Sequence, residues 1–440
     1  MNGLFSFLRE DSSIDEIYDV GPWAGEDTKY LEPDVNERLH HEILDIAKWL
    51  EPSEAERKTR LLVIKRFTNI IEKFYPESIV IPQGSSATDT FLPVSDIDLI
   101  VLNLPPDSEV TDTLRILTKL FLKSKMISNY KVIDHATVPI AKLTERPFGF
   151  SIDICASNIN GALNIPRIRK LLNYHPLFKP ILMFLKLFIY ANQIDDPSSG
   201  GFGSNQIINI VLFSFQSRPD LADNAGRMIL YLFDLFANKF NYILVGVSTV
   251  NDGRLFSKFK CDLITADCPQ ALVFEDPQFR NNFIGRRTSH SLTLTTICRT
   301  ALHSIAVNDY VKCSAVTSFL PDINNLIERR CALERFGRLF DRSLYEFSRT
   351  TDEIPNFIPR GQHPLPPFMQ REKESASYDP KKFMKLKEKK KQKNIQKKQQ
   401  ALMLQIKTLR EREEKKNKNK KKQHFKQAQN RNPTPPRYRR

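Results

Sequence analysis

The sequence lacks the features of membrane, secreted and zinc-binding proteins. No apolar run reaches the ~18 residues that a membrane helix needs, so we expect no membrane association. The first residues, MNGLFSFLREDSS, have neither a basic start nor a long apolar segment, which argues against a secretory signal. The cysteines lack C-x-x-C spacing, which indicates reduced thiols in an intracellular protein and argues against a zinc site. They are Cys155, Cys261, Cys268, Cys298, Cys313 and Cys331.

Acidic residues are nearly absent from the C-terminal end. Residues 381–440 hold 24 Lys and Arg, four Glu and no Asp, a net charge of +20. Because the whole chain carries +15, residues 1–380 carry the difference, −5. A tail of this kind can neutralise RNA phosphates without reading sequence, serve as a nuclear import signal, or only solvate the chain. The sequence leaves these roles open.

Two aspartates one residue apart stand out in residues 84–103, GSSATDTFLPVSDIDLIVLN. Asp96 and Asp98 lead into an apolar run that is typical of a buried strand. Alternate residues on a strand point to the same face, so both carboxylates project together and repel unless a divalent cation binds them. Upstream, Gly84 and Ser85 begin a Gly/Ser/Thr turn whose N–H groups and hydroxyls suit a phosphate. A lone D-x-D is more often structural, but this combination points to nucleotidyl transfer.

A third carboxylate lies in the later segment GFSIDICAS. Asp153 stands there between two isoleucines, so the alternation predicts a strand with the isoleucines in the core and Asp153 on the opposite face. Two-metal phosphoryl transfer needs oxygen ligands of this kind on both ions. The sequence therefore predicts one catalytic and metal-binding site made of Asp96, Asp98 and Asp153.

The G-S turn, the D-x-D and the later single aspartate together resemble the DNA polymerase beta nucleotidyltransferase superfamily. Five further segments narrow the resemblance to the TRAMP-type nuclear poly(A) polymerases, also called the DNA polymerase sigma group. They occur in family order over residues 21–340. The segments are HHEILDIAKWLEPS (40–53), KVIDHATVPIAKLTE (131–145), SGGFGSNQI (199–207), NKFNYILVGV (238–247) and FEDPQFRNNFIGRRT (274–288).

The resemblance implies an α+β fold with two domains. We expect a small mixed-sheet nucleotidyltransferase catalytic domain in residues 56–160. A mainly helical central domain, the PAP-associated domain with its nucleotide recognition motif, is expected in residues 161–349. The other expected segments are a flexible N-terminal arm (1–20), a helical segment that packs with the central domain (21–55), a Pro-containing linker (350–380) and a disordered Lys/Arg-rich tail (381–440).

The same resemblance implies how each site residue acts. The three aspartates are expected to hold two Mg²⁺ ions, with Mn²⁺ as an alternative, and Asp153 to help take the proton of the RNA 3′-hydroxyl. Without the resemblance, Lys186 reads equally well as a snorkelling surface lysine, Ser204 as a helix N-cap and 274–288 as a polar loop. The implied nucleotide-binding residues are Gly84, Ser85, Lys186, Ser204, Asn205, Asn282 and Arg286.

Four positions depart from the family pattern. Asp89 stands where a glycine usually follows G-S-x-x-T, and Asn205 stands where an aromatic stacks on the incoming base. Ser157 replaces an asparagine, although Asn158 is adjacent, and Phe283 replaces an acidic residue. Base–aromatic stacking contributes about 1–3 kcal/mol, so these departures leave nucleotide choice open.

The resemblance implies template-independent addition of adenylates from ATP to RNA 3′ ends. It further implies a place in the nucleus, including the nucleolus, where such tails mark RNAs for exosome processing or decay. A zinc-knuckle RNA-binding protein and an RNA helicase are the implied partners. Two alternatives stay open: a terminal uridylyltransferase or an enzyme of relaxed base choice, and a catalytically weak scaffold that binds RNA or partner proteins.

Overall fold

The computed structural model describes most of residues 21–337 and no residue beyond them. The described residues are 21–25, 30, 32–104, 109–134, 138–156, 160–279, 282–307 and 314–337. Every described residue belongs to one compact unit, which lies within Met1–Ile358. The predicted N-terminal arm, linker and basic tail therefore lie outside the described residues, as does Ser157.

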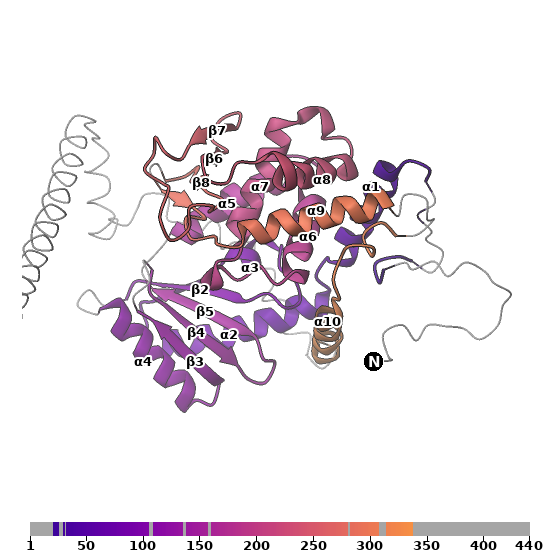
Figure 1. Cartoon of the computed structure of the whole chain (residues 1–440). Helices are drawn as coiled ribbons and strands as arrows, with labels where there is room; N and C mark the ends of the chain where they lie inside the picture. Colours follow the sequence, from indigo (N-terminus) through magenta and orange to yellow (C-terminus); the bar gives the residue numbers. More distant parts are fainter. Residues whose placement is uncertain are drawn as a thin grey trace, which may run out of the picture. The chain divides into compact units, whose positions relative to one another are not determined.

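A five-stranded mixed sheet lies in the predicted catalytic domain (Figure 1), which is called the catalytic domain below. Its strand order is β1-β2-β5-β4-β3, with β2 and β5 parallel and every other pair antiparallel. The strands are β1 (Ile79–Gln83), β2 (Ile97–Leu102), β3 (Ile127–Ile133), β4 (Ile140–Glu145) and β5 (Ser151–Ala156).

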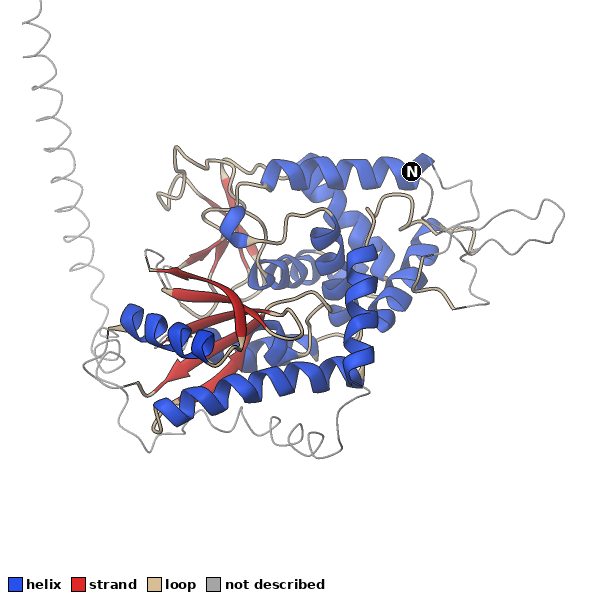
Figure 2. Cartoon of the chain, turned by 90° about the horizontal axis from the view of Figure 1, so that it is seen from below, coloured by secondary structure: helices blue, strands red, loops and turns tan. Residues whose placement is uncertain are grey.

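Helices α2 (Glu54–Phe74) and α4 (Val110–Lys123) cover one face of this sheet (Figure 2). Alternate strand residues such as Leu99, Ile152 and Ile154 are buried against Phe67 of α2 and Phe121 of α4. Because side chains alternate across a strand, Asp98 and Asp153 point to the opposite face. On that face the short helix α3 (Gly84–Thr88) and α5 (Asn160–Leu172) pack beside β1.

The central domain is built around helices that the apolar pattern of the sequence predicts. Nearly every residue of α6 is buried, and α1 packs against both α6 and α8. No described helix meets the length and hydropathy of a membrane span. The helices are α1 (Val35–Trp49), α6 (Phe178–Ala191), α7 (Ser204–Ser217), α8 (Ala225–Asp234) and α9 (Ser291–Val307).

A second sheet, of four short strands, lies in the central domain, which the sequence predicts to be mainly helical. Its order is β7-β6-β8-β9. The strands are two to four residues long, too short for a period-2 pattern to stand out from the surrounding loops. They are β6 (Val245–Ser248), β7 (Arg254–Ser257), β8 (Phe274–Glu275) and β9 (Phe283–Ile284).

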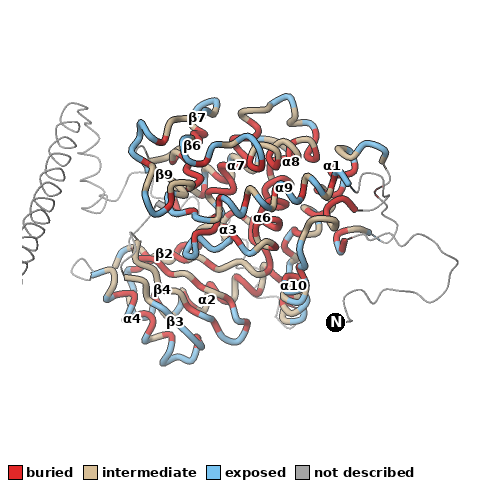
Figure 3. Tube along the Cα trace, viewed as in Figure 1, coloured by how far each residue is buried: buried red, intermediate tan, exposed pale blue. Residues whose placement is uncertain are grey.

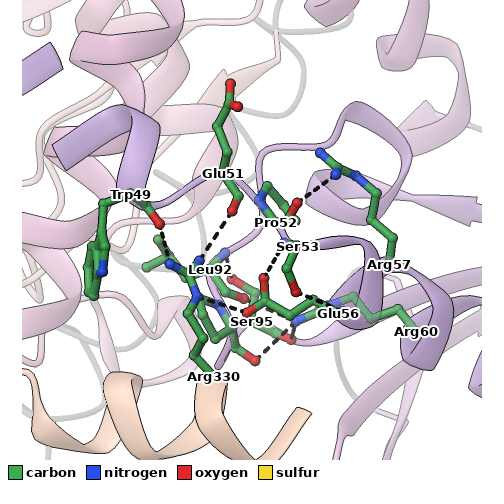
Figure 4. Close-up of polar contacts among 11 residues, drawn as sticks. Trp49, Glu51, Pro52, Ser53, Glu56, Arg57, Arg60, Leu92, Ser95 and Arg330 are labelled. Atoms are coloured by element: carbon green, nitrogen blue, oxygen red, sulfur yellow. Dashed lines mark hydrogen bonds and ion pairs between the residues drawn. The ribbon is translucent and has the colours of Figure 1, made fainter. Parts of the chain in front are cut away.

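The last described helix, α10 (Asn324–Gly337), returns to the catalytic domain and packs on α2 (Figure 4). Arg330 of α10 donates through Nε to Glu56 Oε1 at 3.1 Å and through Nη1 to the carbonyl of Trp49. Glu56 also completes the capping box of α2, since Ser53 N donates to Glu56 Oε2 at 2.7 Å and Glu56 N to Ser53 Oγ at 3.2 Å. One buried carboxylate therefore fixes the start of α2 and the docking of α10.

We expect Glu56→Ala to lower the free energy of unfolding by about 3 kcal/mol, because it leaves the Arg330 guanidinium without its buried partner and removes a cap. Glu54→Ala is the matched control, since Glu54 lies in the same helical turn but forms an exposed pair with Lys58. Its loss should stay below ~1 kcal/mol. Urea denaturation of both variants tests this, and equal losses would contradict it.

Candidate active site

The pairing of β2 with β5 brings two of the predicted carboxylates together. In this parallel pair Asp98 is the direct register partner of Asp153. Directly opposed residues in neighbouring strands have Cβ atoms about 5 Å apart, so the two side chains share one place on the sheet face. Asp96 lies two residues before Asp98, at the entrance of β2. The register thus brings Asp98 and Asp153 together, and the charge of Asp96 acts on both. The roles of the three aspartates as ligands stay a prediction.

Asp98 and Asp153 are half-buried, and this burial disfavours their charged forms. Burial, together with the charges of Asp153 and Asp96, raises the pKa of Asp98 to about 7. Burial also raises the pKa of Asp153 above its usual range, although a hydrogen bond from Lys142 opposes the rise. Lys142 is the register partner of Asp153 on β4, and its Nζ donates to Asp153 Oδ2 at 2.7 Å. One lysine therefore compensates part of a concentrated negative charge.

The chemistry of this donor set fits a divalent cation. All three side chains offer carboxylate oxygens, the ligands that Mg²⁺ and Mn²⁺ prefer. Asp153 Oδ1 is buried and has no hydrogen-bond partner, so it is an acceptor that can bind a cation or a proton. Within the described residues, however, no three His, Cys, Asp or Glu side chains are already gathered closely enough to hold an ion. Binding an ion would therefore require the carboxylates to draw closer together.

Beside the carboxylates, the predicted Gly/Ser/Thr turn is the short helix α3. Gly84 has a φ of +61°, and a Cβ on it would lie 2.5 Å from Asp98 Oδ2. Only glycine fits this position, both for its backbone and for its approach to the carboxylate. Ser85 is buried at the next position, and Arg169 of α5 donates to the carbonyl of Ala87 at 2.9 Å. The α3 segment is thereby held against β2.

Asp89, a departure from the family pattern, fits its position for two reasons. Its φ of +53° is the left-handed conformation that glycine adopts easily and that aspartate tolerates better than most residues. Its carboxylate turns towards α2, where Arg57 donates to it through Nε at 3.2 Å and Nη2 at 2.6 Å. The added negative charge is therefore neutralised locally.

Arg60 of α2 positions the loop that carries Asp96 (Figure 4). The side chain is 2% exposed and donates to the carbonyls of Leu92 at 3.0 Å and Ser95 at 2.7 Å. Its guanidinium also lies 4.1 Å from the ring centroid of Phe91. Burial and the nearby Arg329 lower its pKa to about 9. The loop before β2 is thus fixed through its backbone, which leaves the carboxylate of Asp96 outside this network.

Lys186 of α6 is buried, and its ammonium group does not extend to the surface. It is 7% exposed, and its Nζ donates to the carbonyl of Thr90, in the loop between α3 and β2. Burial and the charge of Arg60 lower its pKa to about 8, while Asp98 opposes that change. A central-domain lysine therefore reaches the catalytic domain near the carboxylates, and triphosphate binding by it remains a prediction.

The other predicted nucleotide-binding residues gather around the start of α7. Gly203 is the N-cap of this helix, so Ser204 is its first residue and not the cap that the simpler interpretation expects. Gln206 joins α7 to the 274–288 segment, because Thr288 Oγ1 donates to Gln206 Oε1 at 3.1 Å. The first part of this segment is the β8–β9 hairpin, held by hydrogen bonds from Asn282 Nδ2 and two backbone N–H groups to Asp276. Arg286 follows it and is exposed.

The structure shows the contacts of two further residues that depart from the family pattern, Asn205 and Phe283. Asn205 accepts from Asn209 Nδ2 at its carbonyl, at 2.7 Å, and at Oδ1, at 3.3 Å. Asn209 Oδ1 in turn accepts from Thr249 Oγ1 at 2.7 Å, so a polar network replaces the aromatic. Phe283 packs on Phe256 with ring centroids 5.8 Å apart and belongs to the hairpin's apolar contacts.

Sequence reasoning missed Lys142 and Arg60. Lys142 lies in an alternating run, Ile140–Glu145, and a lysine at the register position of a carboxylate is detectable once strand pairing is known. Arg60 lies inside an otherwise regular amphipathic helix, and its carbonyl partners are more than 30 residues away, so no local pattern marks it.

Comparisons with known proteins agree with this fold. Residues 39–170 match the family model "Poly(A) RNA polymerase, mitochondrial-like, central palm domain", and residues 224–282 match "Cid1 family poly A polymerase". Poly(A) RNA polymerase CID14 of Cryptococcus neoformans is 30% identical over 255 residues, which are 56% of this chain and 33% of that protein. Poly(A) RNA polymerase protein 2 of Saccharomyces cerevisiae is 27% identical over 275 residues, 60% of this chain and 47% of that protein. The chain thus spans less than half the length of these relatives.

Solved structures show the same fold. The polymerase core of TRAMP, an RNA surveillance complex, superposes with a TM-score of 0.59 at 23% identity and covers 72% of this chain and 98% of its own. A Cid1 poly(U) polymerase mutant bound to MgATP gives a TM-score of 0.55 at 17% identity and covers 65% of this chain and 100% of its own. In sequence and in fold the chain resembles the TRAMP-type poly(A) RNA polymerases, which confirms the resemblance predicted from its motifs.

Proposed function

We propose that this chain transfers adenylates from ATP to RNA 3′ ends without a template. The observation that carries the proposal is the meeting of Asp98 with Asp153 beside Gly84 of α3. The two relatives described above are poly(A) RNA polymerases, which supports the choice of RNA and of ATP. Because this chain spans less than half the length of those relatives, the experiment below tests the activity directly.

Each residue of the site has a role in this reaction. Gly84, Ser85, Lys186 and Ser204 bind the triphosphate, and Asn205, Asn282 and Arg286 contact the nucleoside. Asp153 helps to take the proton of the RNA 3′-hydroxyl, and its partnerless Oδ1 is the atom suited to that step. Lys142 holds the other oxygen of Asp153 in place. Attack on the α-phosphate lengthens the RNA by one nucleotide and releases pyrophosphate.

Asp96, Asp98 and Asp153 would hold two Mg²⁺ or Mn²⁺ ions. Such ions, when bound, lower the pKa of the attacking hydroxyl and neutralise charge on the phosphates. The Cid1 poly(U) polymerase mutant of similar fold binds MgATP, which supports this choice of metal. In this chain the arrangement of the ligands is set by the β2–β5 register and by the contacts of Arg60 with the loop before β2.

The cellular role that we propose is the marking of nuclear RNAs for exosome processing or decay. The basic tail supports contact with RNA and import into the nucleus or nucleolus. The likeness to the polymerase core of TRAMP, which is a complex, supports partner proteins, for which a zinc-knuckle RNA-binding protein and an RNA helicase are our candidates.

The polar network at Asn205 favours a second candidate, an enzyme of relaxed base choice or a terminal uridylyltransferase. Hydrogen bonds at this position replace the stacking that an aromatic gives to any base. Competition between ATP and UTP for one RNA distinguishes the candidates.

We expect the protein to extend a labelled RNA with Mg²⁺ and ATP, and Asp98→Ala to reduce the rate by at least ~10³-fold, because a metal ligand at the reacting phosphate is lost. Each of the four ribonucleotides is offered separately, with Asp96→Ala/Asp98→Ala as a second control. A well-folded Asp98→Ala protein that retains more than a tenth of the activity would contradict the mechanism. Extension mainly with UTP would select the second candidate.

Without metal, Asp98→Asn should be more stable than the wild type at pH 8. A carboxyl whose pKa is 3.8 in the unfolded chain and about 7 in the folded protein costs stability as the pH rises from 4 to 7. The difference between these pKa values corresponds to about 4 kcal/mol once Asp98 is fully ionised. The asparagine has no such cost, so we expect a gain of up to about 4 kcal/mol at pH 8 and of less than about 1 kcal/mol at pH 4. Urea denaturation in EDTA measures it. If Asp98→Asn is less stable than the wild type at pH 8, then ionisation of Asp98 does not lower the free energy of unfolding, and the prediction is wrong.

Deletion of residues 381–440 should weaken RNA binding and flatten its salt dependence. Each lysine or arginine that neutralises a phosphate adds about one unit to the slope of log K against log salt concentration. Binding of labelled RNA between 50 and 300 mM salt tests the tail. Unchanged affinity at low salt would show that the tail serves localisation instead.

A further inference from the structure

A row of five polar side chains crosses the catalytic sheet from one edge to the other. Register pairing joins Gln83 to Asp98, Asp98 to Asp153, Asp153 to Lys142 and Lys142 to Lys131, on strands β1, β2, β5, β4 and β3. Register partners in neighbouring strands point to the same face. The two carboxylates therefore have two lysines of the row, Lys142 and Lys131, on one side. The α3 segment lies on the other side.

A second polar row runs beside the first on the same face. Asn129, Thr144 and Ser151 are register partners, and they lie two residues from Lys131, Lys142 and Asp153 of the first row. Asn129, Thr144 and Lys131 are exposed, and β3 is exposed along most of its length (Figure 3). The second row offers hydroxyl and amide groups and no carboxylate. The face of β3 and β4 is thus open, rich in hydrogen-bond donors and positively charged at Lys131.

The chemistry of transfer decides which part of the substrate can occupy this face. In phosphoryl transfer the attacking and leaving oxygens lie roughly in line on opposite sides of the phosphorus. We have assigned the leaving pyrophosphate to Gly84 and Ser85 of α3, which lies on the β1–β2 side of the carboxylates. The attacking strand must then approach from the opposite side, over β5, β4 and β3.

We propose that the open face of β3 and β4 binds the backbone of the RNA strand next to its 3′ end, with Lys131 on a phosphate. The inference rests on the proposed RNA 3′-end transfer and adds the path of the RNA. Strands lie about 4.8 Å apart, so Lys131 starts about 10 Å from Asp153, beyond the reacting nucleotide. Thr144, Ser151 and Asn129 suit the sugar hydroxyls along this path.

Charge complementarity selects RNA over a protein partner. The nearest acidic side chain on β3's own C-terminal end, Asp134, is paired with Arg115 at 2.9 Å, so it does not cancel the charge of Lys131. Lys142 remains bound to Asp153. Lys131 is therefore the cation of the row that is open to a phosphate.

The test is RNA binding by the full chain with Lys131→Ala, in EDTA, so that no turnover is needed. We expect the slope of log K against log salt concentration to fall by about 1 and the affinity for a six-nucleotide RNA to fall three- to tenfold. Lys119→Ala is the matched control, because Lys119 is an exposed lysine on α4, which covers the opposite face. The control should match the wild type within twofold.

Kinetics and cross-linking locate the effect. Lys131→Ala should raise the KM for RNA and leave kcat and the KM for ATP within twofold, and Lys131→Arg should restore binding. A photoreactive nucleotide next to the 3′ end should cross-link to the peptide that contains 127–133. A raised KM for ATP, an effect equal to that of Lys119→Ala, or cross-links only elsewhere would overturn the inference. Because binding is measured without turnover, absence of activity alone would count only against the proposed function.

Discussion

Repulsion between carboxylates held on neighbouring parallel strands is the constraint that shapes this catalytic domain. The β2–β5 register places Asp98 opposite Asp153, where both side chains are half-buried. Such a site persists only if the surrounding residues hold it in place or compensate its charge. Lys142 compensates it directly, while Arg60 fixes the entrance of β2 through carbonyl groups. The fold thus supplies, before any substrate arrives, most of the organisation that the site needs.

Local patterns explain why much of this arrangement is predictable from the sequence. Asp98 and Asp153 each interrupt a strand-like alternation, so the face they share follows from the period of a strand alone. The parts that could not be predicted depend on contacts between residues that are far apart in the sequence. The partners of Arg60 and Arg330 lie far away in the sequence, and strands of two residues such as β8 carry no period at all. The β4–β5 register, which places Lys142 beside Asp153, likewise depends on how the two strands pair and not on the sequence of either strand alone.

The departures from the family pattern are of two kinds. Asp89 is accommodated, since its backbone adopts the conformation of the expected glycine and Arg57 binds its carboxylate. Asn205 changes the chemistry offered to a ligand, because a polar network with Asn209 and Thr249 stands where the family has a ring. The first kind preserves the backbone of the predicted phosphate-binding segment, whereas the second alters the surface at a predicted nucleotide contact. In the proposed enzyme, a change at Asn205 can therefore alter base choice and leave the carboxylates unchanged.

The ion pair between Glu56 and Arg330 joins residues 274 positions apart, and this has a consequence for how the protein is made. Synthesis at about 5–20 residues per second separates the two side chains by roughly 14–55 s. Until α10 leaves the ribosome, the start of α2 carries a buried carboxylate without its counterion. The catalytic domain, although it is encoded early, thus reaches its final stability only when nearly all of the described chain has been synthesised. Chaperones have that interval in which to act on it.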